Sequence, residues 1–271
     1  MTQLARPDLA RCPSGRDHVR PDCATSELVA AGHPERPRAA RPVPGWVVST
    51  AFLAPAVLVA GWLIGAALQP ASYSPMRETV SALAGDSGTD RWVMTAALLV
   101  VGACQIATGA GLTAVRVPAR VLLIATGLST IGIAVSPEPA TGPTTRHLAF
   151  AVVCVVATAV WPVLVVNRAS RASRATPARR AGPASRAMRG PTQPWILSAR
   201  GCATATALFA GLSFWLLVAA RSGAADLGLV ERLTSGIQGL FPFVVALTLR
   251  HAARGARAAR EQWPRGQERS R

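Results

Sequence analysis

Long apolar runs without charged side chains constrain this chain of 271 residues more than any other feature. The run 46–68 contains 23 residues and no charge. At about 1.5 Å per residue it forms about 35 Å of helix, which is enough to cross the hydrocarbon core of a bilayer. Only 15% of the residues are charged, whereas soluble domains usually carry about 25%. These observations exclude an ordinary soluble fold.

The apolar runs predict an all-α protein, a polytopic membrane helix bundle with six transmembrane helices. Three polar segments surround or interrupt the membrane domain at 46–250: an N-terminal tail at 1–45, a basic linker at 167–198 and a basic C-terminal tail at 251–271. The N-terminal tail is predicted to be disordered, because it has too little apolar surface to offset the entropy of folding. The predicted spans are about 46–68, 92–115, 118–136, 147–166, 199–220 and 233–249.

All 29 basic residues are arginine, and they are distributed unequally between the two sides of the predicted bundle. The two tails, the linker and the loop 116–120 share one side and, with Arg200 and Arg250 at the adjacent span ends, hold 24 arginines, whereas the three opposite loops hold five. Cytoplasmic segments carry the excess of basic residues in membrane proteins. We therefore expect a plasma-membrane protein with both termini in the cytoplasm. The net charge of +16 does not indicate nucleic-acid binding, because long apolar runs have no place in such a domain.

The first outer loop, 69–91, contains a predicted short amphipathic helix. Ser74 followed by Pro75 is typical of a helix start, and Gly85 is suited to end the helix. The predicted helix lies on the outer membrane surface and has one apolar face, formed by Met76, Val80, Leu83 and Ala84.

Polar and charged side chains collect in the outer loops and at the adjacent span ends. Arg77 or Arg91 is suited to bind an anionic head group, because a guanidinium pairs bidentately with such groups. Glu78 or His147 is suited to act as acid or base. The alternative is an ion-paired network that only holds the loops together. The candidate ligand-binding cluster is Tyr73, Arg77, Glu78, Asp90, Arg91, His147, Glu231 and Gln238, and no catalytic residue is assigned.

The predicted spans themselves offer few groups for chemistry. No charged residue is expected in the middle of any span, which argues against an ion-coupled transporter, and Gln105 and Gln238 are the strongest polar side chains at depth. The four histidines lack metal-ligand spacing, so neither a metal nor a cofactor is predicted. Small residues at helical spacing suit close contacts within the chain or in a homo-oligomer: Gly61 with Gly65, and Ala203 with Ala207 and Gly211.

The first outer loop carries a distinctive pattern, Tyr73-Ser74-Pro75-x-Arg77-Glu78-Thr79-x-Ser81-x-Leu83, followed by Asp90-Arg91-Trp92-x-Met94-Thr95. Later residues add to it: His147 at the start of the fourth span, and Glu231-Arg232 before Gly236-x-Gln238-x-Leu240-Phe241-Pro242. These residues resemble the bacterial "domain of unknown function 998" membrane family over about 45–250. The resemblance implies a six-span integral membrane protein whose family has no assigned activity. The long arginine-rich insertion between spans four and five departs from the family's compact pattern.

Three functions remain open from the sequence. The leading interpretation is a non-enzymatic protein that interacts with membrane lipids and binds a lipid or an anionic head group at its outer face. The first alternative is a membrane-embedded enzyme acting on a lipid-linked substrate, which requires Glu78 and His147 to approach a common pocket. The second is a small-molecule permease, which requires a continuous polar path through the bundle.

Overall fold

The computed structural model describes residues 42–165 and 194–268. Within these ranges the protein is helical and contains no strand, and six helices are long and apolar enough to cross a membrane. The predicted fold class is confirmed, whereas the predicted N-terminal tail and most of the basic linker lie outside the described residues. The spanning helices are α2 (Gly45–Ala67), α4 (Trp92–Gly111), α5 (Val117–Ala134), α6 (Thr145–Val165), α9 (Ala199–Ser222) and α10 (Leu227–Glu268), and the two short helices are α3 (Val80–Leu83) and the 3-10 helix η2 (Trp195–Leu197).

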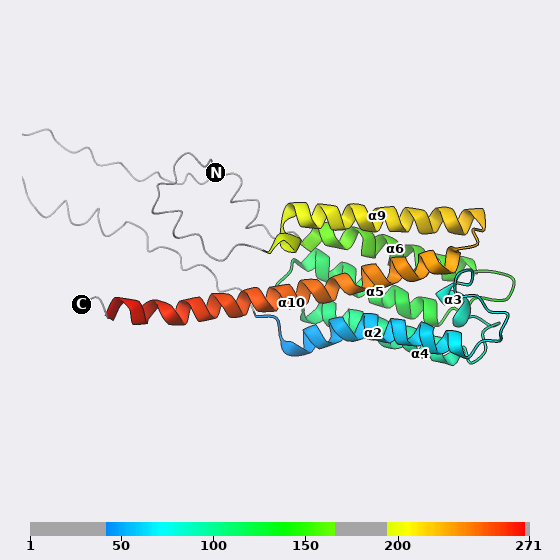
Figure 1. Cartoon of the computed structure of the whole chain (residues 1–271), viewed down its shortest axis with the longest axis horizontal. Coiled ribbons are helices and arrows are strands. Elements are labelled where there is room, and N and C mark those ends of the chain that lie inside the picture. The colour runs from blue at the N-terminus through cyan, green and yellow to red at the C-terminus, as the bar shows by residue number, and fades with distance from the viewer. Residues whose placement is uncertain (1–41, 166–193, 269–271) are drawn as a thin grey trace, which may run out of the picture. The chain divides into compact units, whose positions relative to one another are not determined.

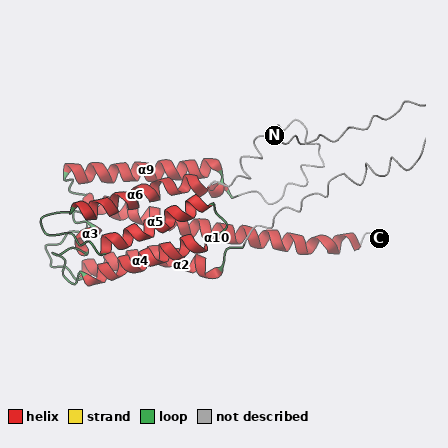
Figure 2. Ribbon diagram, turned by 180° about the vertical axis from the view of Figure 1, so that it is seen from behind, coloured by secondary structure: helices red, strands yellow, loops and turns green. Residues whose placement is uncertain are grey.

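The six spanning helices form a closed ring in chain order. Each helix packs against the next, from α2 to α4, α5, α6, α9 and α10, and α10 closes the ring on α2. In Figure 1 α10 lies on the near side of the bundle, and Figure 2 shows α4, α5 and α6 from behind. The α2–α4, α5–α6 and α9–α10 connections lie together with α3 at one end of the bundle, which we call the loop end.

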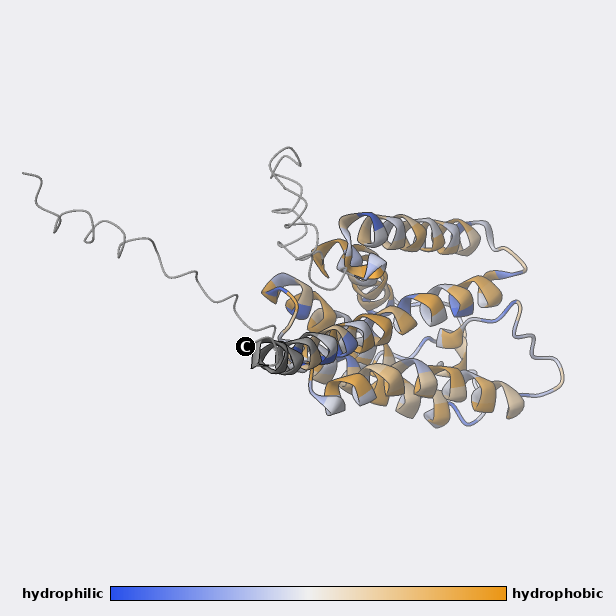
Figure 3. Ribbon diagram, turned by 60° about the vertical axis from the view of Figure 1, so that its left-hand side comes forward, coloured by the Kyte–Doolittle hydropathy of each residue, from blue (hydrophilic) through white to orange (hydrophobic). Residues whose placement is uncertain are grey.

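The surface of the bundle is apolar, and its interior is rich in small and hydroxyl-bearing residues. Large side chains such as Phe52, Val152 and Phe214 are exposed, and hydrophobic residues run along the bundle helices (Figure 3). By contrast, Thr126 and Thr130 are buried on α5. Each threonine hydroxyl donates to the carbonyl four residues earlier, at 3.0 Å, which satisfies it within its own helix. Large apolar side chains outside and small or hydroxyl-bearing residues inside are typical of helices that pack together in lipid.

Close helix contacts inside the ring depend on small residues. A Cβ atom at Gly102 of α4 would lie 2.7 Å from the carbonyl oxygen of Gly127 on α5, so the two helices approach more closely than a side chain would permit. Gly61 serves the same purpose, because a Cβ there would lie 2.5 Å from Cβ of Ala97. The Gly61–Gly65 pair therefore serves packing within the chain, since Gly65 in turn lies against Leu83. The small-residue stripe of Ala203, Ala207 and Gly211 is instead exposed on α9.

The helix predicted in the first outer loop is present, but it is shorter than expected. Thr79 has an extended backbone, and its hydroxyl accepts a hydrogen bond from the Ala82 amide at 3.0 Å, so α3 begins after Thr79 instead of after Ser74. Its apolar side chains face the protein: Val80 is 5% exposed and Leu83 is 1% exposed. The prediction that its apolar face lies in the membrane surface is therefore wrong, because α2 and α10 cover that face.

The last helix is longer than the predicted span at 233–249. α10 begins at Leu227 and continues to Glu268, so it includes Glu231 and Arg232, which the sequence places in a loop, and most of the predicted C-terminal tail. Asp226 directly precedes the helix, and aspartate is favoured at the residue before a helix. Glu231 and Arg232 consequently lie in the first two turns of a spanning helix, near its start and not in its middle.

The contact of α4 with α5 predicts opposite effects for two glycine substitutions. Gly102→Ala is expected to lower the free energy of unfolding by about 1–3 kcal/mol, because the added methyl overpacks the contact with Gly127. Gly211→Ala is the matched control, since nothing lies within 4 Å of a Cβ there, and it should leave stability unchanged or raise it. Thermal unfolding in detergent, followed by tryptophan fluorescence, measures both. Equal melting temperatures for Gly102→Ala and wild type would contradict the predicted contact.

Candidate functional site

A cavity of about 180 Å³ lies inside the ring, and all six spanning helices together with α3 contribute to its wall. Most of the wall is apolar and comes from residues such as Leu58, Val101 and Val155. Polar groups occur at two levels. Ser81 and Glu231 lie towards the loop end, whereas Gln105, Thr130, Thr158 and Gln238 lie nearer the middle of the bundle.

Around the middle of the cavity, hydrogen bonds join neighbouring helices. The Thr130 hydroxyl of α5 lies 3.0 Å from Oε1 of Gln105 on α4, as close as to the Thr126 carbonyl, so its one proton is shared between the two acceptors. Gln238 of α10 is 4% exposed, and its Nε2 donates to the Phe209 carbonyl at 3.2 Å and to Ser213 Oγ at 3.0 Å, both on α9. Gln105 and Gln238 therefore have the interhelical role expected of polar groups in a membrane, and they also line the cavity.

A second cavity of about 20 Å³ continues past the two glutamines, and Gln105, Thr158 and Gln238 line both cavities. Aromatic side chains close the bundle at this level. Trp161 and Phe209 each pack edge-on against Phe241, with ring centroids 5.7 Å and 5.4 Å apart. The Trp161 indole also donates to the Ala119 carbonyl at 2.7 Å. The polar lining thus begins at the loop end and ends at an aromatic cluster.

Glu231 connects the wall of the cavity to α3. Its Oε2 accepts a hydrogen bond from the Val80 amide at 2.6 Å, and its Oε1 accepts one from the Ser81 hydroxyl at 3.4 Å. The carboxylate thereby satisfies an amide at the start of α3, where a negative charge is favoured. Glu231, Thr234, Ser235 and Gln238 all line the cavity, because spacings of three, four and seven residues lie on one helix face.

Arg232 points to a different face of α10 and binds the first outer loop. Its Nη1 donates to the carbonyls of Pro75, Glu78 and Gly228 at 2.7, 2.8 and 2.9 Å, and its Nη2 donates to the Tyr73 hydroxyl at 2.6 Å. Burial raises the pKa of the Tyr73 hydroxyl, although the Arg232 guanidinium opposes this effect. We call this set of contacts the Arg232 latch.

The Arg232 latch requires α10 to approach the loop closely. The Leu229 amide donates to the Met76 carbonyl at 3.1 Å. The preceding Gly228 leaves no room for a side chain, because a Cβ there would lie 2.7 Å from the Pro75 carbonyl oxygen and closer still to that of Glu78. Glycine is therefore the residue that this contact permits.

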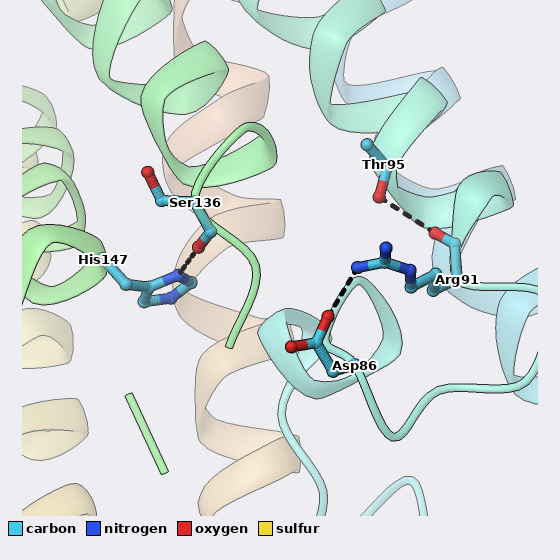
Figure 4. A network of polar contacts seen from close by, with 5 residues as sticks. All are labelled: Asp86, Arg91, Thr95, Ser136 and His147. Carbon is cyan, nitrogen blue, oxygen red and sulfur yellow. Dashed lines mark hydrogen bonds and ion pairs between the residues drawn. The ribbon is translucent and has the colours of Figure 1, made fainter. Parts of the chain in front are cut away.

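The other charged candidates of the first loop form a separate surface group. The Arg91 Nη1 pairs with Asp86 Oδ1 at 2.7 Å, and 49% of the Arg91 side chain is exposed (Figure 4). Asp90 accepts a hydrogen bond from the Trp92 indole at 3.3 Å. Both contacts join residues that are close in sequence at the end of the first outer loop, and such exposed pairs contribute little stability.

His147 lies in a third environment. Only 4% of the residue is exposed, and its Nδ1 donates to the Ser136 carbonyl at 2.8 Å (Figure 4). The neighbouring Glu138 accepts a hydrogen bond from the Asp86 amide through its carbonyl, at 2.9 Å. Burial raises the pKa of the Glu138 carboxyl, and His147 partly opposes that effect.

The structure divides the predicted cluster of site residues. Glu231 and Gln238 line the central cavity, whereas Glu78 and Tyr73 contact Arg232 and the remaining members lie elsewhere. Arg77 is exposed. Neither Glu78 nor His147 belongs to the cavity wall, so the common pocket that the enzyme alternative requires is not found among the described cavities.

The predicted cluster did not include two residues that the structure places at the site, Arg232 and Ser81. The spacing from Glu231 to Ser235 and Gln238 is the sequence signal that could have identified the cavity face of α10.

Comparison with known proteins adds a family match. A family model described as "Protein of unknown function (DUF998)" matches residues 52–248. No match was found among curated proteins or among solved structures. The matched segment includes the cavity, the Arg232 latch and His147.

The Arg232 latch predicts a difference between two arginine substitutions. Arg232→Ala is expected to lower the free energy of unfolding by about 1.5–3 kcal/mol, because it removes charged hydrogen bonds to four acceptors. Arg91→Ala removes one exposed ion pair and should cost less than about 1 kcal/mol. Thermal unfolding in detergent tests the difference. Limited proteolysis should also cut the 73–78 segment faster in Arg232→Ala, and equal rates would contradict the latch.

Glu138 predicts a pH dependence with a definite sign. Because its pKa is higher in the folded protein than the ordinary value of 4.5, the folded state holds the proton more tightly than the unfolded state. The contribution of Glu138 to stability is therefore full below pH 4.5 and is lost as the pH rises through the folded pKa. Glu138→Gln should remove this part of the pH dependence, as measured by melting temperature against pH. An unchanged profile would contradict the prediction.

Proposed function

Because the chain belongs to the DUF998 family of proteins of unknown function, its activity has to be inferred from its own site, and we propose that it is a non-enzymatic membrane protein that binds a small amphipathic molecule in the central cavity. The observation that carries the proposal is the cavity itself, which has contributions from every spanning helix. Its mostly apolar wall with a few placed polar groups is typical of a ligand site.

The size of the cavity limits the ligand. An apolar cavity of about 150 Å³ is large enough to bind benzene, so about 180 Å³ accommodates one aromatic ring or a short stretch of an aliphatic chain. A whole lipid is too large. A lipid would have to place one end in the cavity, with its polar group beside Ser81 and Glu231.

The charge of the cavity wall argues against an anionic ligand in it. Glu231 is acidic, and no arginine lines the cavity. An anionic head group at the outer face would depend on Arg77, since Arg91 pairs with Asp86 and Arg232 is occupied by the latch. We therefore place the ligand in the cavity and propose that it is neutral or positively charged.

A small-molecule permease is the second candidate function. The observation that favours it is the second cavity beyond Gln105 and Gln238, which extends the polar lining towards the other end of the bundle. Transport would require the cluster of Trp161, Phe209 and Phe241 to separate. We further propose a plasma-membrane location with both termini cytoplasmic, supported by the arginine distribution and by the even number of spans.

Benzyl alcohol is a suitable probe for the cavity, and two alanines of α6 provide matched variants. Ala151 lines the cavity, whereas Ala149 is exposed on the same helix. Saturating benzyl alcohol should raise the melting temperature of wild type and of Ala149→Phe, but not of Ala151→Phe, whose ring occupies the cavity. At ten times its dissociation constant a ligand stabilises the folded state by about 1.4 kcal/mol.

Comparing Arg77→Ala with Ala151→Phe distinguishes a ligand site at the outer face from one in the cavity. Native mass spectrometry of the lipids that co-purify with each variant should give the wild-type profile for Arg77→Ala and an altered profile for Ala151→Phe. A change in Arg77→Ala alone would favour an anionic head group at the outer face instead. An equal response of Ala151→Phe and wild type to benzyl alcohol would refute binding in the cavity.

A further inference from the structure

Glu231 is the charged residue on the wall of the central cavity; the other described residues that line it are apolar or uncharged polar. A single carboxyl group on an otherwise uncharged cavity wall is a specific chemical feature, because ionisable groups within membrane spans are costly and mark functional sites. The charge of Glu231 is therefore the property of the cavity that a ligand is most able to recognise.

The adjacent arginine does not cancel this charge. Arg232 and Glu138 are the charged residues near enough to interact electrostatically with Glu231. The Arg232 guanidinium donates to the Tyr73 hydroxyl and to carbonyls of the loop and of α10, and among the described residues the recorded ion pair is Arg91 with Asp86. The guanidinium is thus engaged with the loop and with its own helix, whereas the Glu231 carboxyl faces the cavity.

The Glu231 carboxylate also has unused capacity to accept hydrogen bonds. A carboxylate has about four lone-pair sites, whereas Glu231 accepts one short bond from the Val80 amide and one long bond of 3.4 Å from the Ser81 hydroxyl. The short bond fixes the carboxylate against α3 through Oε2. Oε1 is left with a weak partner and can accept a stronger donor.

The surroundings of Glu231 favour an organic cation over a metal ion. Hard metal ions take about six or more oxygen ligands, whereas the wall near Glu231 adds the hydroxyls of Ser81 and Ser235. No group of three metal-binding side chains occurs among the residues that the structure describes. The apolar wall instead suits the carbon body of a ligand, with its charged nitrogen at one end.

We propose that the central cavity selects a primary ammonium ligand with an apolar body about the size of one aromatic ring, and that Glu231 binds the ammonium group. The ammonium donates to Oε1 of Glu231 and to the hydroxyl of Ser81 or Ser235, and the apolar body lies against the wall towards Gln105 and Gln238. This inference rests on the proposed binding function and adds the chemical class of the ligand.

Three probes of nearly equal shape test the charge selectivity: benzylamine, which is protonated at neutral pH, benzyl alcohol and benzoate. Binding to the full-length protein in uncharged detergent is measured by the shift in melting temperature against probe concentration. Wild type should bind benzylammonium at least about tenfold more tightly than benzyl alcohol, because a charge-assisted hydrogen bond is about twice as strong as a neutral one. Benzoate should not bind measurably.

Two glutamate substitutions assign the selectivity to one residue. Glu231→Gln keeps an acceptor for the Val80 amide but removes the charge, and it should bind benzylammonium and benzyl alcohol equally. Glu78→Gln is the matched control, since Glu78 is exposed in the same outer region, and it should keep the wild-type preference. If Glu231→Gln does not fold, Glu231→Asp retains the charge but withdraws it by one methylene, and it should show a reduced preference.

The outcomes separate this inference from the binding function on which it rests. Equal affinity of wild type for benzylammonium and benzyl alcohol would overturn the charge selectivity while leaving binding in the cavity intact. A tenfold preference that persists in Glu231→Gln would overturn the role of Glu231. Failure of wild type to bind either probe would overturn both the selectivity and the proposed function.

Discussion

The hydrocarbon interior of a membrane provides no water to satisfy a peptide group, and this constraint underlies the rest of the structure. It requires helices, and it places large apolar side chains such as Phe52 and Phe214 on the outside. Since lipid provides no hydrophobic drive for helices to associate, close packing and hydrogen bonds have to hold the ring together. Gly102 against Gly127 supplies the packing, and Gln238 against Phe209 and Ser213 supplies the hydrogen bonds.

Closure of the ring by α10 positions Glu231, Arg232 and Gln238 in the candidate site. Successive residues of a helix point about 100° apart, so the neighbours Glu231 and Arg232 serve different surfaces. Glu231 faces the cavity and the start of α3, whereas Arg232 holds the first outer loop. Glu231 thereby contacts α3 directly, and Tyr73 of the loop contacts α10 through Arg232.

The charged residues discussed above occupy three separate places in the structure. The exposed pair of Arg91 with Asp86 lies within the first outer loop, the Arg232 latch joins that loop to a spanning helix, and Glu231 places a carboxyl group on the cavity wall. The residues of the polar outer cluster inferred from the sequence are therefore divided among separate places. The cavity, whose wall includes the two deep glutamines Gln105 and Gln238, is the site where a ligand has room.

The sequence by itself determined the six-span helical architecture and the place of the two glutamines within spans, because apolar length and residue polarity are local properties. It also indicated a helix in the first outer loop, although Thr79 begins it later than Ser74. Only the tertiary structure decided that the ring closes through α10 on α2, that Glu231 lies in a spanning helix beside a cavity, and that Glu78 and His147 lie outside the cavity wall. The physical reason is that a cavity arises where helices distant in sequence fail to fill the space between them, and no local pattern of residues records the shape of that space.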